Sequence, residues 1–330
     1  MMSNDQLSVI FHIGMPRAGS TSLQLNLFNR ESLFIQYGEP NAPKQPWHQG
    51  GLGIPIAPDG DEGIDIVREG MIKAHKKAPG KSFVISDESF LSVNTRLSDQ
   101  ELFARRIKSL GFSSKVLIVI RRQEDIAVSR YRQLQTIKAW SVLGFPFLKS
   151  LPVPELFKER VGEIGYPKSL LKMPSFSEWL DMGLSGVYAN WFSNLFYDRV
   201  YEAYARILGS ENVVVVPYEM YKNDIDTFSR GLSDLVGVSY EDVIGSLSGR
   251  KWNQSSDRKW ERVFTPAKRN GLGVANSFSL FFDKLIGRGG FVPDLGDEQK
   301  QIVEEIFGGS NKRMESLSSL NLREFGYAVR

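Results

Sequence analysis

The sequence predicts an α/β protein of three layers, in which helices flank a central, mostly parallel sheet. Short apolar runs that suit strands buried on both faces alternate with segments of helical spacing. The first run, residues 7–13, leads through a glycine-rich loop directly into a helical segment at residues 20–30. The sequence has no internal repeat and no low-complexity linker, so we expect residues 1–330 to form a single domain.

The later elements follow from the same alternation. Further strands are expected at residues 83–86, 115–120 and 212–217. Helices are expected at residues 64–77, 98–110, 124–140, 188–208, 224–236 and 241–247, with more after Asp294. Residues 38–63 are rich in proline and glycine, which predicts a long functional loop.

The composition excludes several kinds of chemistry. The chain has no cysteine, so disulfides, thiol catalysis and thiolate metal ligands are ruled out. Its three histidines, His12, His48 and His75, show no metal-ligand spacing, and we expect no metal site. A net charge of +3 is too balanced to indicate nucleic acid, although it suits an anionic small molecule. The first residues are polar and no membrane-length apolar stretch follows, so we expect a cytoplasmic protein.

The loop after the first predicted strand has the spacing of a Walker phosphate loop. Gly14 and Gly19 have four residues between them, and backbone N–H groups at such a strand–loop–helix junction can hold phosphate. Ser20 replaces the lysine that should follow the second glycine, and the cation of the loop is instead Arg17. Two glycines at this spacing are a weak signal alone, but the strand and helix around them strengthen it. The moved cation argues against ATP hydrolysis and for a different phosphate-bearing donor.

A second phosphate-type segment begins where the predicted strand at residues 115–120 ends. Arg121 follows that strand directly, and Ser129 lies early on the next predicted helix. Ligands of open α/β sheets bind beyond the carboxyl ends of the strands, so we expect both residues at the same edge as the glycine loop. Arginine suits a terminal phosphate because its planar fork gives two parallel, charge-assisted hydrogen bonds. Taken singly, each residue could be an ordinary surface residue, but the two segments together favour one nucleotide site.

Together these segments resemble the sulfotransferases that use 3′-phosphoadenosine 5′-phosphosulfate (PAPS). The stretch RRQEDIAVSRY, which contains Arg121, Asp125, Ser129 and Tyr131, is similar to that family's 3′-phosphate motif, and residues 15–21 look like its 5′-phosphosulfate loop. The resemblance implies a P-loop-like fold, no required metal, and adenosine 3′,5′-bisphosphate as the nucleotide product. It also implies a donor site formed by Arg17, Ala18, Gly19, Ser20, Thr21, Ser22, Arg121 and Ser129.

One residue departs from the family's pattern. Where the family usually has a lysine that contacts the bridging oxygen of the leaving phosphate, this chain has Arg17. Arginine keeps the charge and adds hydrogen-bond donors, but it does not give up a proton at ordinary pH. Sulfuryl transfer needs mainly alignment and charge stabilisation, so we expect Arg17 to serve as the catalytic cation. Slower chemistry, or donor binding without turnover, is the alternative.

Two adjacent carboxylates, Asp87 and Glu88, follow the predicted strand at residues 83–86. This segment resembles the place where carbohydrate sulfotransferases carry a glutamate as general base, so Glu88 is our first choice and Asp87 the second. Neighbouring residues of an extended chain point opposite ways, so only one of the two should face the site. His48 is a third choice, because some sulfotransferases use histidine. Both carboxylates could instead be solvated or cap the next helix.

Two later segments complete the expected site. Arg250 and Lys251 open a basic, polar stretch at residues 250–270. The resemblance implies that this stretch is a lid that closes over the nucleotide and contacts its 3′-phosphate, and an ordinary surface loop is the alternative. Residues 133–175 mix aromatic and cationic side chains, which suits a cap on the acceptor side or a surface that touches the inner face of a membrane. We therefore expect a carbohydrate, a glycolipid or another small hydroxyl compound as the acceptor.

Two other functions compete with this hypothesis. A P-loop kinase that uses ATP and magnesium would explain the glycine loop. The missing lysine and the absence of a convincing aspartate-terminated Walker B strand argue against it. The second alternative is a catalytically impaired nucleotide-binding protein that keeps the fold and has lost turnover.

Overall fold

The structure is a computed structural model that describes residues 7–15, 17–37, 62–91, 95–134, 175–187, 191–248 and 295–330. It divides into two compact units. The first comprises Met1–Gln123, Asn190–Asn253 and Val303–Arg330, and the second comprises Glu124–Ala189 and Gln254–Ile302. Compactness alone does not make either unit an independent domain, so the single domain expected from the sequence stays a prediction. Within the described ranges, every helix is too short or too polar to cross a membrane.

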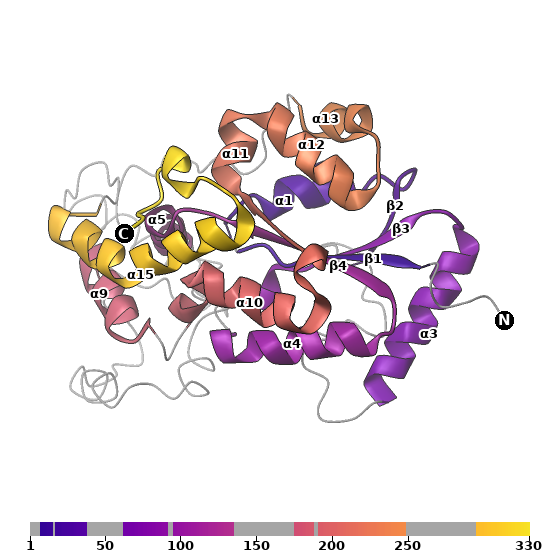
Figure 1. The fold of residues 1–330 in the computed structure, drawn as a ribbon, viewed down its shortest axis with the longest axis horizontal. Helices are drawn as coiled ribbons and strands as arrows, with labels where there is room; N and C mark the ends of the chain where they lie inside the picture. Colours follow the sequence, from indigo (N-terminus) through magenta and orange to yellow (C-terminus); the bar gives the residue numbers. More distant parts are fainter. Residues whose placement is uncertain are drawn as a thin grey trace, which may run out of the picture. The chain divides into compact units, whose positions relative to one another are not determined.

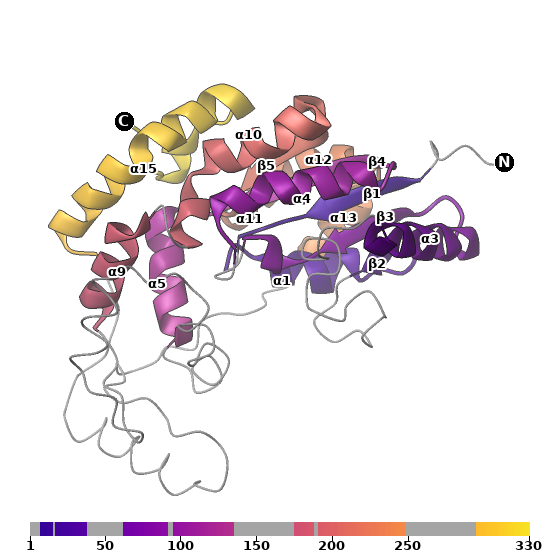
Figure 2. The same ribbon diagram turned by 90° about the horizontal axis from the view of Figure 1, so that it is seen from below.

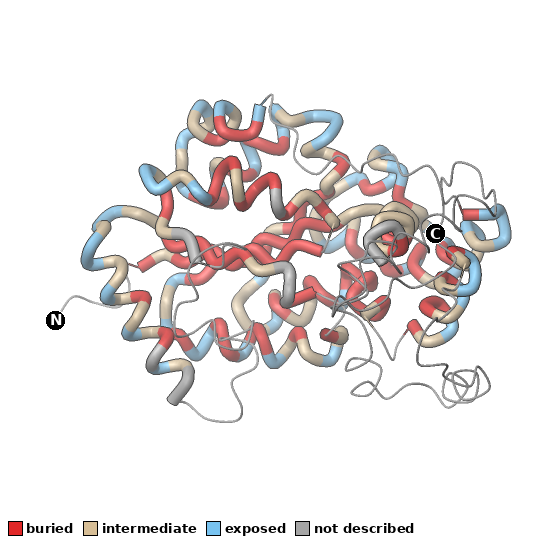
Figure 3. The backbone as a smooth tube through the Cα atoms, turned by 180° about the vertical axis from the view of Figure 1, so that it is seen from behind, coloured by how far each residue is buried: buried red, intermediate tan, exposed pale blue. Residues whose placement is uncertain are grey.

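The first unit contains a five-stranded sheet in which all neighbouring strands are parallel (Figure 1). The strands are β1 (Ser8–His12), β2 (Phe34–Tyr37), β3 (Ser82–Ser86), β4 (Ser113–Ile120) and β5 (Val213–Pro217), in the spatial order β2-β3-β1-β4-β5. Their apolar residues are largely buried on both faces, as Figure 3 shows in red. The predicted α/β class with a parallel sheet is confirmed, and the edge strand β2 is added to the predicted strands.

Helices cover both faces of this sheet (Figures 1 and 2). On one face lie α1 (Ser20–Leu23), its π-helical continuation η2 (Gln24–Phe28), α11 (Tyr218–Asn223), α12 (Ile225–Val236) and α13 (Tyr240–Leu247). On the other face α4 (Leu97–Ser109) packs beside α10 (Tyr197–Leu208). Arg68 of α3 (Glu62–Lys77) donates hydrogen bonds to the carbonyls of Ser109 and Leu110 at the end of α4. The expected arrangement of a sheet flanked by helices is therefore confirmed.

One predicted helix is wrong in its extent. We expect a continuous helix over residues 188–208, but a 3₁₀ turn, η6 (Trp191–Leu195), precedes α10, and Phe196 interrupts the two with a ψ of 82°. The turn places the buried Asn194 side chain where its amide donates a 3.0 Å hydrogen bond to the carbonyl of Thr95. Because a buried amide needs hydrogen-bond partners, this contact favours the break over a continuous helix.

The second unit is described over α5 (Gln123–Leu134) from Glu124 onward, α9 (Phe176–Ser185) and the first residues of α15 (Asp297–Ser318). Tyr131 of α5 is buried, and its ring centroid lies 5.2 Å from that of Phe176 and 5.7 Å from that of Trp179. Tyr131 therefore packs α5 against α9. The remaining described elements are three 3₁₀ turns, η4 (Glu88–Leu91), η7 (Ser210–Asn212) and η8 (Leu322–Phe325).

Candidate functional site

The glycine loop leaves β1 at the carboxyl edge of the sheet. Beyond the strand, the amide of Met15 still donates a 3.0 Å hydrogen bond to the carbonyl of Val119 in β4. The chain then turns sharply, with φ of 74° at Arg17 and 81° at Gly19. A left-handed arginine carries backbone strain of about 1–3 kcal/mol, and such strain is found where a site requires the geometry. The backbone therefore marks Arg17 independently of its charge.

The glycine-rich sequence leads us to expect that the amides of residues 18–22 hold phosphate, but the loop itself uses two of these five. The amide of Ala18 donates to the carbonyl of Met15 at 3.0 Å, and that of Ser22 donates to the carbonyl of Gly19 at 2.9 Å. The amides of residues 19–21 lie between these two, at the start of the helix, where backbone N–H groups have no acceptor within the helix. These three amides are the better candidates for an anion.

The structure brings Arg121 to the glycine loop. Its Nη1 donates a 2.7 Å hydrogen bond to the carbonyl of Arg17. The guanidinium also lies over the ring of Tyr218, with Cζ 5.0 Å from the ring centroid. The same ring lies against Gly19, where a Cβ would stand only 2.6 Å from it. Tyr218, at the start of α11, thus joins the two phosphate-type segments through contacts that sequence spacing does not reveal.

The hydroxyl of Ser22 faces the interior. It is hydrogen-bonded to the hydroxyl of Tyr221 at 2.7 Å and accepts from the amide of Asn26 at 3.2 Å. The hydroxyl and the backbone amide of Ser22 therefore both already have partners within the protein. The buried hydroxyl of Ser20 differs, because it has no hydrogen-bond partner among the described residues.

The two carboxylates follow β3 at the same edge of the sheet. Ser86 is in register with His12 of β1, and the amide of Asp87 donates to the carbonyl of His12 at 3.1 Å. Asp87 is half-buried, and Glu88 begins η4. The side chain of Glu88 lies outside the described part of the structure. The segment expected to carry the general base therefore lies beside the strand that carries the glycine loop.

A chain of buried polar groups lies beneath the loop. Gln24 Nε2 donates to Ser86 Oγ at 3.0 Å, and Ser86 Oγ is 2.6 Å from His12 Nδ1. Burial lowers the pKa of His12 from 6.5 to about 3, so its imidazole is neutral at physiological pH. Like Ser20 Oγ, His12 Nε2 has no hydrogen-bond partner among the described residues. A Cβ on Gly14 would lie 2.7 Å from each of these two atoms, so glycine leaves the space between them open.

A buried acid, Glu219, follows Tyr218 and is absent from the predicted site residues. Its Oε1 accepts from the amide of Arg122 at 3.2 Å, and its Oε2 accepts from the hydroxyl of Tyr327 at 2.8 Å. Burial raises the pKa of Glu219. These contacts tie α11 to the end of β4 and to the C-terminal segment, and so fix the helix that carries Tyr218.

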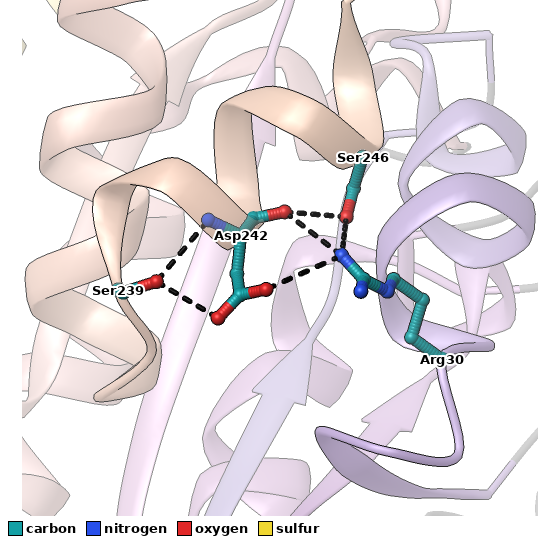
Figure 4. Close-up of polar contacts among 4 residues, drawn as sticks. All are labelled: Arg30, Ser239, Asp242 and Ser246. Atoms are coloured by element: carbon teal, nitrogen blue, oxygen red, sulfur yellow. Dashed lines mark hydrogen bonds and ion pairs between the residues drawn. The ribbon is translucent and has the colours of Figure 1, made fainter.

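Arg30 lies just after η2, and its side chain anchors this part of the chain to α13 (Figure 4). Its Nη1 donates to the carbonyl of Asp242 at 3.2 Å and to Ser246 Oγ at 2.8 Å, with a carboxylate oxygen of Asp242 3.7 Å away. Ser239 caps the same helix by accepting from the amide of Asp242. The helical segment behind the glycine loop is thus held at both ends, by Tyr221 and through Arg30.

Several predicted site residues lie outside the described part of the structure, namely His48, Arg250 and Lys251, together with the side chain of Thr21. The same holds for most of the predicted loop at residues 38–63, the cap at 133–175 and the lid at 250–270. Ser129 lies half-buried on α5, in the second unit. Where side chains are described, no cluster of three or more His, Asp or Glu is arranged to hold a metal ion.

No family model and no curated protein sequence matches this chain. Among solved structures, a sulfotransferase from Alicyclobacillus acidocaldarius is 18% identical, covering 96% of this chain and 97% of its own, with a TM-score of 0.47. Mouse sulfotransferase SULT7A1, complexed with PAP, is 14% identical over 98% of this chain and 88% of its own, with a TM-score of 0.46. The sulfotransferase domain from the curacin biosynthetic pathway is 12% identical over 92% and 98%, with a TM-score of 0.42. Scores below 0.5 do not establish a relationship between this chain and these proteins.

Proposed function

We propose that this protein is a sulfotransferase that moves a sulfuryl group from PAPS to a hydroxyl or amine of a carbohydrate or glycolipid-type acceptor. The observation that carries the proposal is the contact between the two arginine-containing segments that follow β1 and β4. Arg121 Nη1 donates to the carbonyl of Arg17 at 2.7 Å, so the segment like a 3′-phosphate motif lies against the segment like a 5′-phosphosulfate loop. A nucleotide with phosphates at both its 3′ and 5′ positions matches two such sites, whereas ADP and ATP carry a single phosphate chain.

The reaction would be an in-line displacement at sulfur. The acceptor oxygen or nitrogen forms a bond to sulfur, while the bond between sulfur and the bridging phosphate oxygen breaks. The amides of residues 19–21 would hold the 5′-phosphosulfate. Arg17 would neutralise the charge that develops on the leaving phosphate. Arg121 and Ser129 would hold the 3′-phosphate, which distinguishes this donor from ADP.

A general base would take the proton of the acceptor. Glu88 remains our first choice, Asp87 the second and His48 the third. The position of β3 beside β1 supports the carboxylates, because the amide of Asp87 donates directly to the last residue of the strand that precedes the glycine loop.

A transfer assay tests this function directly. The purified chain is incubated with radiolabelled PAPS, a metal chelator and a panel of glycans and glycolipids, and the labelled products are separated. We expect label on at least one acceptor in the absence of metal. In a parallel arm, labelled ATP with magnesium replaces PAPS, and phosphate transfer only in that arm would make the chain a kinase. Tight binding of adenosine 3′,5′-bisphosphate with no transfer from PAPS would indicate the impaired nucleotide-binding protein.

A further inference from the structure

Two buried polar atoms beneath the glycine loop have no hydrogen-bond partner among the described residues. They are His12 Nε2 and Ser20 Oγ, and both residues are only 1% exposed. Each atom lies 2.7 Å from the point where a Cβ on Gly14 would stand. No direct hydrogen bond joins the two atoms, but both approach the same small space and lie close enough for one water to bridge them. Buried groups of this kind need partners, so their juxtaposition calls for an explanation.

The rest of the chain fixes which nitrogen of His12 carries the proton. Ser86 is fully buried, and its Oγ already accepts from Gln24 Nε2 at 3.0 Å. The hydroxyl proton of Ser86 then needs an acceptor, and His12 Nδ1 lies 2.6 Å away. The reverse assignment would leave that proton buried without an acceptor among the described residues, at a cost in free energy. With Nδ1 accepting, the neutral imidazole carries its proton on Nε2, the atom that approaches Ser20.

With this assignment, the hydrogen bonds from Gln24 to Ser86 and from Ser86 to His12 all donate in the same direction, toward Ser20. The Nε2–H of His12 is a donor only, so a water that bridges the two atoms accepts from Nε2 and donates to Ser20 Oγ. Ser20 then has its own hydroxyl proton left to donate. Ser20 is the first residue of α1, among the loop amides best placed for an anion. Hydrogen bonds that run in one direction along a buried chain polarise one another, which strengthens the last donor.

We propose that His12 is a positioning residue that orients the hydroxyl of Ser20 as a hydrogen-bond donor to the 5′-phosphate end of the nucleotide. The chain from Gln24 through Ser86 and His12 to Ser20 also ties the end of β3, which carries the candidate base, to the glycine loop. This inference rests on the proposed function, because it takes the anion at the loop to be the 5′-phosphate of the donor.

The test compares two nucleotides that differ only at the 5′ position. Affinities for adenosine 3′,5′-bisphosphate and adenosine 3′-monophosphate are measured calorimetrically for wild type, His12→Phe, Ser20→Ala and the double variant. We expect His12→Phe and Ser20→Ala each to weaken bisphosphate binding about tenfold, as for one hydrogen bond to a charged group. Affinity for the 3′-monophosphate should stay within about twofold in both variants. The double variant should be no weaker than either single one, because His12 acts through Ser20.

His12→Gln is the matched control, since its amide can place an N–H near the position of Nε2. It should retain bisphosphate affinity within about threefold, and it keeps the test usable if His12→Phe fails to fold. Equal bisphosphate affinity in wild type and His12→Phe would overturn the inference and leave the proposed function standing. Equal losses for both nucleotides, or additive losses in the double variant, would also overturn it. A wild-type protein that binds ADP with magnesium and not the bisphosphate would overturn the proposed function itself, and the inference with it.

Discussion

The two arginines that we expect to act on phosphate follow neighbouring strands, yet the protein holds them in different ways. Arg17, after β1, is fixed through its backbone, which has a φ of 74° and a carbonyl bound by Arg121. Arg121, after β4, is fixed through its side chain, which lies on the ring of Tyr218 and donates to that carbonyl. Loop geometry thus positions the first arginine, and side-chain packing positions the second.

This difference separates the roles that we expect of them. A strained backbone is kept where reacting groups need a preorganised geometry. A guanidinium that stacks on an aromatic ring is a preorganised binding group for a terminal phosphate. We therefore expect Arg17 to act mainly on turnover and Arg121 mainly on nucleotide affinity.

Replacing Arg17 should have the largest effect. Arg17→Ala is expected to lower kcat for sulfuryl transfer by about 100- to 1000-fold, the loss typical of removing one group that stabilises a developing negative charge. Arg17→Lys is the matched control, because it places a side chain at the same left-handed position and keeps the positive charge. It should retain kcat within about tenfold. A large loss of nucleotide affinity with kcat unchanged would reverse the roles assigned to the two arginines.

Replacing the carboxylates that follow β3 tests whether this segment completes the site formed by the segments after β1 and β4. Glu88→Gln is expected to lower kcat by about 100-fold or more, with nearly unchanged affinity for adenosine 3′,5′-bisphosphate, as for the loss of a general base. Asp87→Asn and His48→Ala, measured beside it, identify the base if it is not Glu88. Unchanged turnover in Glu88→Gln would remove Glu88 from the mechanism.

Arg121→Ala should weaken binding of adenosine 3′,5′-bisphosphate by about 2 kcal/mol, or roughly 30-fold, for a lost charge-assisted pair. Adenosine 5′-monophosphate separates the two possible causes, because it lacks the 3′-phosphate. Its affinity should change little if Arg121 binds the 3′-phosphate. An equal loss for both nucleotides would mean that Arg121 acts only by supporting the loop at Arg17. Arg105→Ala, which removes an exposed arginine of α4, is the control and should keep bisphosphate affinity within about threefold.

The buried imidazole behind the loop predicts a dependence of stability on pH. The pKa of His12 is lowered by burial to about 3 in the folded protein, against 6.5 in the unfolded chain. Below pH 6.5 the unfolded chain therefore binds a proton that the folded protein does not, and the free energy of unfolding falls as pH falls toward 3. By pH 5 this loss amounts to about 2 kcal/mol. Urea unfolding at pH 7 and pH 5 measures this loss in free energy of unfolding for wild type and for His12→Gln. The loss should be smaller in His12→Gln by that amount. Identical losses in the two proteins would contradict a neutral, buried His12.

Much of the fold follows from local pattern. The runs that form β1, β3, β4 and β5 are apolar enough to predict strands buried on both faces. The glycine loop, Asp87 and Arg121 directly follow β1, β3 and β4, so predicting these strands also places these features at one edge of the sheet. β2 is harder to recognise, because an edge strand of four residues with Gln36 inside it gives little signal. The break at Phe196 is favoured by a hydrogen bond between Asn194 and Thr95, which are distant in sequence.

The site shows the same limit more sharply. Spacing and residue type are enough to propose Arg17 and Arg121, but they do not reveal that one side chain binds the carbonyl of the other. Tyr218 is brought onto Gly19 by the position of β5 beside β4, a consequence of topology that no local pattern encodes. The orientation of His12 likewise depends on Ser86, which is 74 residues away in sequence.

The most direct measurement is calorimetric binding of adenosine 3′,5′-bisphosphate and ADP to the full chain, each with and without magnesium. The two strand-end sites predict micromolar binding of the bisphosphate, independent of metal and tighter than that of ADP. Preference for ADP that requires magnesium would contradict the sulfotransferase function and make this a kinase-like protein.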